Sequence, residues 1–556
     1  MEQRRLFMAI ALSVLVFLLW ELFFVDKKTI QQGTENNRVI EVAKENLSQT
    51  SIAQVRSNLT EQILKKNKEI TDSAFKPAKS ITVNTPLYKL KISEAGAAFE
   101  SFVLKEYREK VESQSPLLEM VSANLRGGAL QVGFADNGIP GIEDAIFSAE
   151  LSSGFVEIRN APMKISFLWE SPEGIIVEKR YLFSPETYLI GLDIIITNNS
   201  KRILDDNLIL SLQNTPPKGG GSLGFEGPSA LINNKLEQIK LKKIAKNDTY
   251  TGSIAWIALQ DRYFMSSIIP TEPEQASMLL FLETEKKLKA VYMHPRTMIS
   301  PGVRHVYGYN LFFGPKSMRI LKKFDLDLDK AIHFGMFDFL AKPCVMVMNF
   351  LYGLTPNYGL AIIILTLLIK LILWPLGSKS YKSMAEMKRL QPLMAEIREK
   401  YKHDKQKMNM EVMGLYKTYK VNPLGGCLPM LVQIPIFFAL YRMLYEAIEL
   451  RHAPFFGWIN DLSAPDRLLH FGFSIPFMQP PCGIPVLTII MGGTMFLQQK
   501  MAPPMGGDPI QAKLMTFMPI MFTVIFINFS SGLVLYWLIN NIVSISQQYY
   551  IQKKYV

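Results

Sequence analysis

The most constraining feature of the sequence is the stretch Asn357 to Pro375, NYGLAIIILTLLIKLILWP. It is apolar over roughly the 20 residues that a membrane-spanning helix needs, yet it contains Lys370, with Thr366 one helical turn earlier. At ~1.5 Å per residue, Lys370 lies roughly 7 Å along the helix from Pro375, and therefore within one leaflet. Either the lysine snorkels to the nearer headgroups, or it faces a polar cavity inside the protein.

Polar side chains in the later apolar segments favour the cavity. Each of these side chains would be unfavourable against lipid. The amides concerned are Gln433, Gln498, Asn528, Asn540 and Asn541. We therefore predict that these groups face one another or water and share a polar cavity with Lys370.

The composition indicates a membrane domain joined to a large water-soluble domain. The chain has 556 residues, of which 48% are hydrophobic, and a net charge of +12. That is too apolar for an ordinary soluble protein and too charged for a purely lipid-embedded one. Three cysteines and six histidines show no disulfide framework or zinc-ligand spacing, so neither a metal nor a cofactor is predicted.

The N-terminal segment is predicted to be a membrane anchor. An apolar run from Leu6 to Leu19 follows Arg4 and Arg5, which is also typical of a cleavable signal peptide. The run continues into bulky residues from Trp20 with no small-residue cleavage site, which favours a retained anchor over residues 1–25. Residues 26–80 are polar and predict a flexible tether.

Residues 81–327 are predicted to form an all-β sandwich. Apolar residues alternate with polar ones in several short runs, which is typical of half-buried antiparallel strands. The apolar positions are Tyr88, Leu90 and Ile92, then Ile190, Leu192, Ile194 and Ile196, then Leu208, Leu210 and Leu212. At this length the domain can bury a core of its own.

Two features of the predicted β-domain were considered as sites. The glycine run at 219–221 lacks the GxxxxGK[ST] pattern of a phosphate-binding loop. His294 and His305 could act as acid or base with Glu226 or Glu283. Two histidines in so large a domain are more often incidental, and catalysis is the weaker interpretation.

The next segments predict a path through the membrane. Residues 328–354 are predicted to form an amphipathic helix in the outer interface, followed by a span over 355–377. A strongly basic stretch comes next, which the positive-inside rule places in the cytoplasm. Its cations are Lys379, Lys382, Lys388, Arg389, Arg398, Lys400, Lys402, Lys405, Lys407, Lys417 and Lys420.

Within this basic stretch, residues 378–422, methionines recur at helical spacing on both sides of His403 and Asp404. This pattern predicts an antiparallel helical hairpin. The methionines either join the two helices or capture apolar clients. The basic face could touch ribosomal RNA or acidic lipid, but nothing marks a sequence-specific nucleic-acid reader.

Four further spans complete the chain. They are Leu428 to Tyr445 within residues 423–447, and Ile484 to Gln498, Leu514 to Phe529 and Gly532 to Ile545 within residues 484–556. Residues 448–483 between the first two are predicted to be an interfacial loop on the outer side. With the anchor, this gives six transmembrane helices, both termini in the cytoplasm and the β-domain outside.

Several long motifs now resemble the bacterial YidC-type insertases of the YidC/Oxa superfamily. They are GSIAWIALQDRYF (252–264), VNPLGGCLPMLVQIPIFFALYRML (421–444), ELRHAPFFGWINDLSAPD (449–466), GGTMFLQQKM (492–501) and LMTFMPIMFTVIFINFSSGLVLYWLINN (514–541). The resemblance covers essentially the whole chain. It implies a polytopic α-helical membrane protein with a five-helix insertase core and a periplasmic β-supersandwich. It also places the tether, the amphipathic interfacial helix and the interfacial loop in the periplasm.

The resemblance also implies a function and a site. The function is insertion and folding of membrane proteins, with no bond made or broken, through a hydrated groove bearing one positive charge. Lys370 occupies the place of the family's usual arginine, and keeps the charge without arginine's planar fork. The implied client contacts are Thr366, Gln433, Ile434, Phe437, Tyr536 and Trp537.

The implied partners are nascent membrane proteins, the Sec translocon, the ribosome or signal recognition particle pathway, and the lipid bilayer of the bacterial inner membrane. Two alternatives remain open. A solute or ion transporter would use Lys370 as a coupling charge, but the spans show no internal repeat and no paired carboxylates. A membrane-tethered enzyme or sugar-binding module would lose its function with the β-domain, whereas an insertase would keep its core function.

Overall fold

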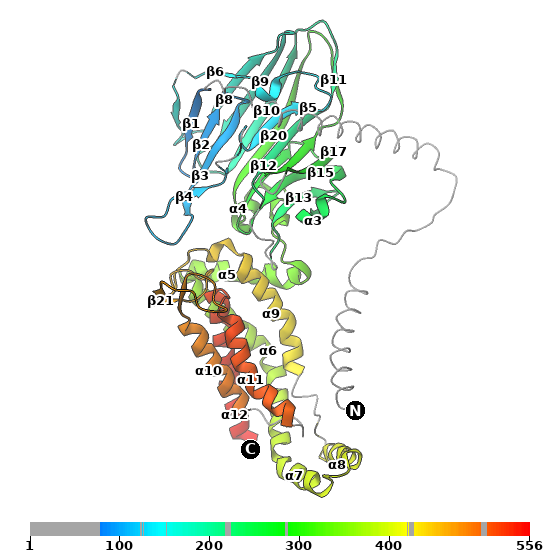
Figure 1. Cartoon of the computed structure of the whole chain (residues 1–556), viewed down its shortest axis with the longest axis vertical. Coiled ribbons are helices and arrows are strands. Elements are labelled where there is room, and N and C mark those ends of the chain that lie inside the picture. Colours follow the sequence, from blue (N-terminus) through cyan, green and yellow to red (C-terminus); the bar gives the residue numbers. More distant parts are fainter. Residues whose placement is uncertain are drawn as a thin grey trace, which may run out of the picture. The chain divides into compact units, whose positions relative to one another are not determined.

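The computed structural model describes residues 78–556, except 123–124, 126, 152, 217–223, 284–286, 420, 422–427, 502–508 and 556. The predicted anchor, nearly all of the tether and the glycine run therefore lie outside the described residues. Strands dominate up to Pro315, and helices dominate from Asp338 onward (Figure 1). This confirms a β-rich domain followed by a helical one.

Two sheets build the β-domain. The larger has 13 strands, in the order β5 (Leu130–Phe134), β12 (Leu208–Asn214), β18 (Lys287–Met293), β17 (Glu274–Glu283), β15 (Thr249–Gln260), β16 (Phe264–Pro270), β20 (Arg304–Pro315), β10 (Leu189–Asn198), β9 (Ile175–Phe183), β8 (Met163–Glu170) and β6 (Ser148–Ala149), with β13 (Gly227–Ile232) and β14 (Lys235–Gln238) branching from β15. The smaller has the order β4 (Leu117–Glu119), β3 (Ala98–Arg108), β2 (Tyr88–Ser93), β1 (Ser80–Asn84) and β7 (Phe155–Glu157). A separate ribbon pairs β11 (Leu204–Asp206) with β19 (Thr297–Ile299).

The two sheets pack face to face through aromatic side chains. The ring of Phe99 on β3 lies 5.5 Å from Tyr181 on β9 and 5.4 Å from Phe313 on β20, measured between centroids. Phe102 stacks on Phe313 at 5.2 Å. Each such pair stabilises the core by roughly 0.5–1.5 kcal/mol beyond the area that it buries. The core therefore lies between the sheets.

Strand β2 follows the alternation that its sequence predicts. The side chains of Tyr88, Leu90 and Ile92 are buried, whereas those of Lys89 and Lys91 are exposed. Successive side chains of a strand point to opposite faces, so a single buried face selects this register.

The helical domain contains a set of long helices and a short β-hairpin. They are α5 (Asp338–Leu354), α6 (Tyr358–Arg389), α7 (Gln391–Lys400), α8 (Lys405–Thr418), α9 (Leu428–Glu446), β21 (Leu468–Phe471), β22 (Cys482–Ile484), α10 (Val486–Met501), α11 (Pro509–Phe526) and α12 (Ser531–Tyr555). The short helices α3 (Leu241–Ile244) and α4 (Met318–Leu321) belong to the β-domain and its exit.

Helix α6 carries both the apolar stretch and the start of the basic one. Asn357 caps it, since its side chain accepts a hydrogen bond from the Leu360 amide at 3.1 Å. The helix then continues through Pro375 to Arg389. The lysines that follow Pro375 are therefore on the same helix as Lys370.

Length and composition single out two helices among the described residues as able to cross a membrane. They are Gly335–Leu354 and Tyr358–Arg389, and Thr516–Phe526 is a shorter apolar helix. The first of these, which includes α5, exposes Phe339, Phe350 and Leu354 and buries Val345 and Met348. The number of spans remains a prediction.

Contacts tie the C-terminal end of α9 and the residues just after it to the β-domain. Arg262, which follows β15, donates from Nε to the Tyr445 carbonyl at 2.8 Å, and its guanidinium lies 3.6 Å from the centre of the Tyr445 ring. Ser317 Oγ donates to the Glu449 carboxylate at 3.0 Å. The C-terminal end of α9 is thus the end that meets the β-domain.

Candidate functional site: a polar seam between helices α6, α9 and α12

The ammonium group of Lys370 points from α6 to α12. Its Nζ donates a hydrogen bond to Ser544 Oγ at 2.8 Å, and Ser544 Oγ donates to the Asn540 carbonyl at 2.7 Å. A lysine ammonium has three donors. The bond to Ser544 uses one of these three donors and holds the amine between the two helices.

A polar column on α12 extends this contact to α9. Its members recur every fourth residue, and so lie on one face of the helix: Tyr536, Asn540, Ser544 and Gln548. Gln433 on α9 donates from Nε2 to Asn540 Oδ1 and is also hydrogen-bonded to Tyr536. Lys370 and Gln433, on different helices, are therefore joined through α12.

Other polar groups of α12 are satisfied inside the bundle. Asn541 Nδ2 donates to Thr494 Oγ1 on α10 at 3.1 Å. Gln547 Nε2 donates to the Trp374 carbonyl at 3.0 Å and to Ser378 Oγ at 3.1 Å. Gly377 makes room for this amide, because a Cβ there would lie 3.0 Å from the amide atoms of Gln547.

An aromatic wall adjoins the polar column. Phe437 on α9 meets Trp537 on α12 edge to face, with ring centres 4.6 Å apart. Trp537 also contacts Phe526 of α11 at 5.2 Å. Ile434, one turn before Phe437 in sequence, is 39% exposed. Apolar and polar surfaces therefore run side by side between α9 and α12.

A pocket of about 290 Å³ opens beside Lys370. Its lining is otherwise apolar and consists of Ile364, Leu367, Leu368, Leu371, Trp374 and Val543 together with Lys370. Leu371 is 68% exposed, so the apolar rim is accessible from outside the protein. The pocket places one positive charge next to a surface suited to an apolar chain.

The implied client contacts differ in accessibility. Gln433, Phe437 and Trp537 are half-buried, and Ile434 is exposed. Tyr536 is buried behind the seam, and so is Thr366, whose hydroxyl donates to the Ile362 carbonyl of its own helix at 2.7 Å. The side chains of Thr366 and Tyr536 thus pack inside the bundle and do not line an accessible surface.

One residue of the expected polar set lies elsewhere. Asn528 is in the turn between α11 and α12, where it binds the backbone of Phe477 and Gln479. The prediction that it shares a cavity with Lys370 is wrong. The reason is that α11 ends at Phe526, before the expected span end at Phe529.

The sequence analysis did not predict four further polar residues at this site, Ser544, Gln547, Gln548 and Tyr381. Tyr381 is hydrogen-bonded to both Ser544 and Gln498, which connects the inner half of α6 to α10 and α12. The signal for two of the four was present, because α12 runs to Tyr555, and Gln547 and Gln548 follow Ser544 at a spacing of three to four, beyond the expected span end at Ile545.

The candidate acid–base groups of the β-domain pair differently from expectation. His294 Nε2 lies 2.9 Å from Glu274, a residue not considered from the sequence. Glu283 instead pairs with Lys287 at 3.6 Å, and Lys316 and Arg262 are the cations near Glu226. Pairing of His294 or His305 with Glu226 or Glu283 is therefore wrong.

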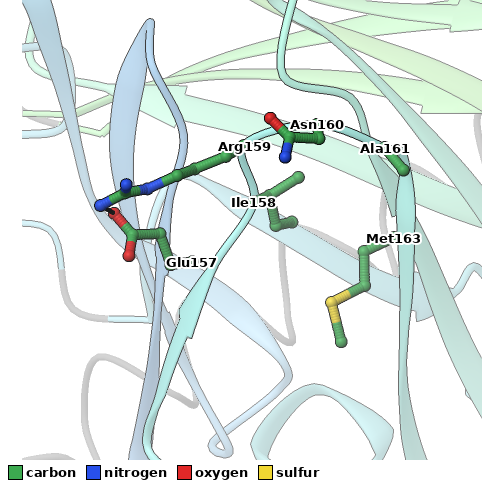
Figure 2. Close-up of a pocket in the computed structure, with 6 residues that line it drawn as sticks. All are labelled: Glu157, Ile158, Arg159, Asn160, Ala161 and Met163. Carbon is green, nitrogen blue, oxygen red and sulfur yellow. Dashed lines mark hydrogen bonds and ion pairs between the residues drawn. The ribbon is translucent and has the colours of Figure 1, made fainter.

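A surface hollow on the β-domain has the features of a turn rather than of a site. Its volume is about 300 Å³, and it is lined by Glu157, Ile158, Arg159, Asn160, Ala161 and Met163 (Figure 2). The six residues lie along one short stretch, from Glu157 at the end of β7 to Met163 at the start of β8, and Glu157 pairs with Arg159 at 2.8 Å. Across the described part of the chain, no group of three or more His, Cys, Asp or Glu side chains could hold a metal ion.

A β-rich domain joined to an apolar helical domain with a polar seam is the architecture of a membrane protein that carries a large water-soluble domain. Two family models match this chain: "YidC periplasmic domain" over residues 80–347 and "60Kd inner membrane protein" over residues 350–556. The chain belongs to the YidC family of membrane protein insertases.

Individual relatives agree. The chain is 39% identical to the membrane protein insertase YidC of Syntrophus aciditrophicus, over 99% of each chain. It is 42% identical to that of Citrifermentans bemidjiense, over 86% of each. A crystal structure of an active YidC insertase with its first transmembrane domain resolved covers 86% of this chain and 93% of its own, with 21% identity and a TM-score of 0.37.

The family settles the function at this level. The protein is a membrane protein insertase of the inner membrane with a periplasmic β-rich domain, it acts on nascent membrane proteins, and it is not an enzyme. The transporter and tethered-enzyme alternatives are thereby set aside.

Proposed function

We propose that the seam between α6, α9 and α12 is the client groove of this insertase and that Lys370 is its working charge. The observation that supports this most directly is the chain of hydrogen bonds from Lys370 through Ser544 and Asn540 to Gln433. Polar groups joined in this way lower the cost of bringing a polar client segment into the membrane. A charged residue at the centre of a bilayer otherwise costs roughly 2.5–3.5 kcal/mol on insertion scales.

The polar and the apolar surface of the groove contact different parts of the client. Lys370 attracts acidic residues of the translocated client segment, because two unit charges ~8 Å apart interact by roughly 2 kcal/mol at an effective dielectric constant of ~20. The apolar segment of the client passes over Ile434, Phe437 and Trp537 into lipid. Thr366 and Tyr536 keep the wall of the groove in place.

The test is insertion of a two-span client into liposomes that contain only this protein, with clients of graded acidic content. Lys370→Arg keeps the charge and should preserve insertion. Lys370→Ala should impair it, most for the acidic clients, and Lys370→Glu should lower it by roughly tenfold or more, because attraction becomes repulsion.

Lys379→Glu is the matched control. Lys379 is on the same helix and is exposed beyond the pocket, so the same change of charge there should leave insertion near the wild-type rate. Normal insertion of acidic clients by Lys370→Glu would refute the groove-charge mechanism. Insertion in liposomes that lack Sec also tests whether the protein works alone, and addition of the translocon tests whether the two cooperate.

We further propose six spans with both termini in the cytoplasm. In support, α6 carries the apolar stretch and the first cations of the basic stretch as one continuous helix, and its start and the end of α9 lie toward the β-domain. Single cysteines at positions 3 and 554, labelled by an impermeant maleimide from each side of the membrane, test this topology. Labelling of either one from the periplasmic side would exclude it.

The hairpin of α7 and α8 is proposed to receive ribosomes or incoming clients. Its helices meet where Tyr416 Oη donates to Met394 Sδ at 3.5 Å, whereas Met410 and Met413 are 65% and 52% exposed. Methionines of both kinds thus occur, some joining the helices and some open to clients. Removal of residues 401–405 should slow insertion several-fold while the protein still folds. Full activity without the whole hairpin would disprove this role.

A further inference from the structure

The loop between α9 and α10 presents a group of largely exposed apolar side chains, in which Phe473 stacks on Phe471 with ring centres 5.3 Å apart. Its tip comprises most of β21 and the turn that follows it toward β22, at one end of the helical bundle (Figure 1). Leu469 and Phe473 are each 66% exposed, and Phe477 is 83% exposed, the largest exposed fraction of any large apolar side chain that the structure describes. We call residues 469–477 the apolar tip.

The apolar tip belongs to an uncharged stretch. Residues 468–499 contain no Asp, Glu, Lys or Arg, and His470 is the one histidine among them. Water-exposed protein surfaces seldom leave large apolar side chains grouped without charged neighbours. The absence of charge continues from the tip directly into α10, which is apolar.

Hydrogen bonds join the apolar tip to the connection between α11 and α12. Asn528, between α11 and α12, donates to the Phe477 carbonyl at 2.7 Å and accepts from the Gln479 amide at 2.9 Å. Arg467 donates to the Ile527 carbonyl at 2.8 Å and to the Pro481 carbonyl at 3.0 Å. These bonds fasten the tip to the connection between the last two helices.

The backbone also keeps the side chains turned outward. Leu469 and Phe477 have φ angles of 54° and 64°, in the left-handed region that bulky residues rarely adopt. Such a conformation persists only where the surrounding contacts impose it. The exposed side chains are therefore presented by the fold and are not incidental to a loose loop.

The side of the membrane is known from the other end of the same loop. The loop begins at the end of α9, where Tyr445 and Glu449 contact the periplasmic β-domain. The tip thus lies at the periplasmic surface of the membrane domain, next to the outer ends of α10 and α12.

We propose that the apolar tip inserts into the outer leaflet and anchors the outer ends of α10, α11 and α12 at a fixed depth. Lipid is the occupant that the observations favour, because the tip is uncharged, rich in phenylalanine, and continuous with helices that already lie in the bilayer. A fixed outer boundary on these three helices would leave α6 and α9 to adjust to the passing client.

The test places an environment-sensitive fluorophore on Phe477→Cys in the full chain, with Cys344, Cys427 and Cys482 changed to Ala, in liposomes. Met298→Cys, at a β-domain site that is 72% exposed, is the aqueous control, and Ile372→Cys, on α6 and 76% exposed, is the lipid control. We expect lipids with a doxyl group on the upper acyl chain to quench the label at 477 as they quench that at 372. Iodide in water should quench it several-fold less than the label at 298.

A second variant separates the insertion of the apolar tip into lipid from the folding of the protein. Phe477→Asp combined with a label at Phe473→Cys should reduce doxyl quenching at 473 at least threefold, while Phe477→Leu should leave it unchanged. Iodide quenching at 477 equal to that at 298 would overturn the proposal. It would instead assign the tip to water and to a protein partner.

Discussion

Two lysines of this protein are withdrawn from water in different ways. Lys179, on β9 between the two sheets, is 1% exposed, donates to the Gly96 carbonyl at 2.6 Å and lies 4.7 Å from the centre of the Phe147 ring. Lys370, on α6, bonds to Ser544 but lines a pocket whose apolar rim is open. The first amine is enclosed by its partners, whereas the second bonds to α12 on one side and borders the open pocket on the other.

This difference separates a structural cation from a working one. Lys179 fastens the turn before β3 to the large sheet, with Tyr181 Oη donating to the neighbouring Ala97 carbonyl at 2.8 Å. No client can reach it. Lys370 keeps donors in reach of whatever enters the pocket, so its charge can act on a passing chain. A buried lysine therefore indicates a functional role when a client can reach its charge, as at Lys370, and a structural role when it is enclosed, as at Lys179.

The comparison is tested most strongly by removing Lys179. Lys179→Ala should lower the free energy of unfolding of the β-domain by roughly 2–4 kcal/mol, because it opens a cavity and leaves the Gly96 carbonyl without its donor. Denaturant unfolding followed by β-domain fluorescence measures this. Insertion per folded molecule should stay near wild type.

Lys89→Ala on β2 is the control, since Lys89 is exposed and its loss should change stability by less than about 0.5 kcal/mol. If Lys179→Ala abolished insertion while the β-domain stayed as stable as wild type, the division between structural and working lysines would fail.

The second test is the pH dependence of stability. Burial lowers the pKa of Lys179 from 10.5 to about 7. Between these values the unfolded chain binds the proton and the folded chain releases it, so stability rises with pH by up to about 1.4 kcal/mol per unit. From pH 7 to pH 9 the β-domain should gain on the order of 2 kcal/mol through this group.

Lys179→Met fills the site without a titrating group, and the difference between it and wild type cancels the other ionisations. The variant should lack this gain when unfolding is measured at both pH values. An identical pH dependence in the two proteins would show that Lys179 stays charged in the folded state.

The sequence predicted Lys370 but not Lys179, for a physical reason. A single charge inside a long apolar helix is conspicuous, because lipid offers it no partner. Lys179 is in phase with Ile175, Val177 and Tyr181 on the buried face of β9, but strands often carry lysine, and only the packing of the second sheet shows that this one is enclosed. The alternation of β2 and the β-rich domain followed from sequence because one face of each strand is buried.

The polar seam was only partly predictable. Gln433 and Asn540 stand out as amides in apolar segments, and the structure joins them. Ser544 does not stand out, because a serine hydroxyl can bond the carbonyl four residues earlier and is tolerated in any membrane helix. Asn528 was misplaced because helix ends are poorly defined by hydropathy, and the end of α11 determines on which side of the boundary an amide falls.

The finest test concerns the bond that holds Lys370. Ser544→Ala removes the acceptor but keeps the charge, so insertion of acidic clients should fall only about 2- to 10-fold, in line with the 0.5–1.5 kcal/mol of a typical hydrogen bond. Ser544→Thr retains the hydroxyl and should stay near wild type. Insertion rates in liposomes measure both effects, and the loss caused by Lys370→Ala is the reference.

If Ser544→Ala lost as much activity as Lys370→Ala, the hydroxyl would be as necessary as the charge, and Lys370 would resemble Lys179 in depending on a complete set of partners. If Ser544→Ala lost nothing, water would hold the amine as well as the protein does, and the open side of the pocket would be what matters.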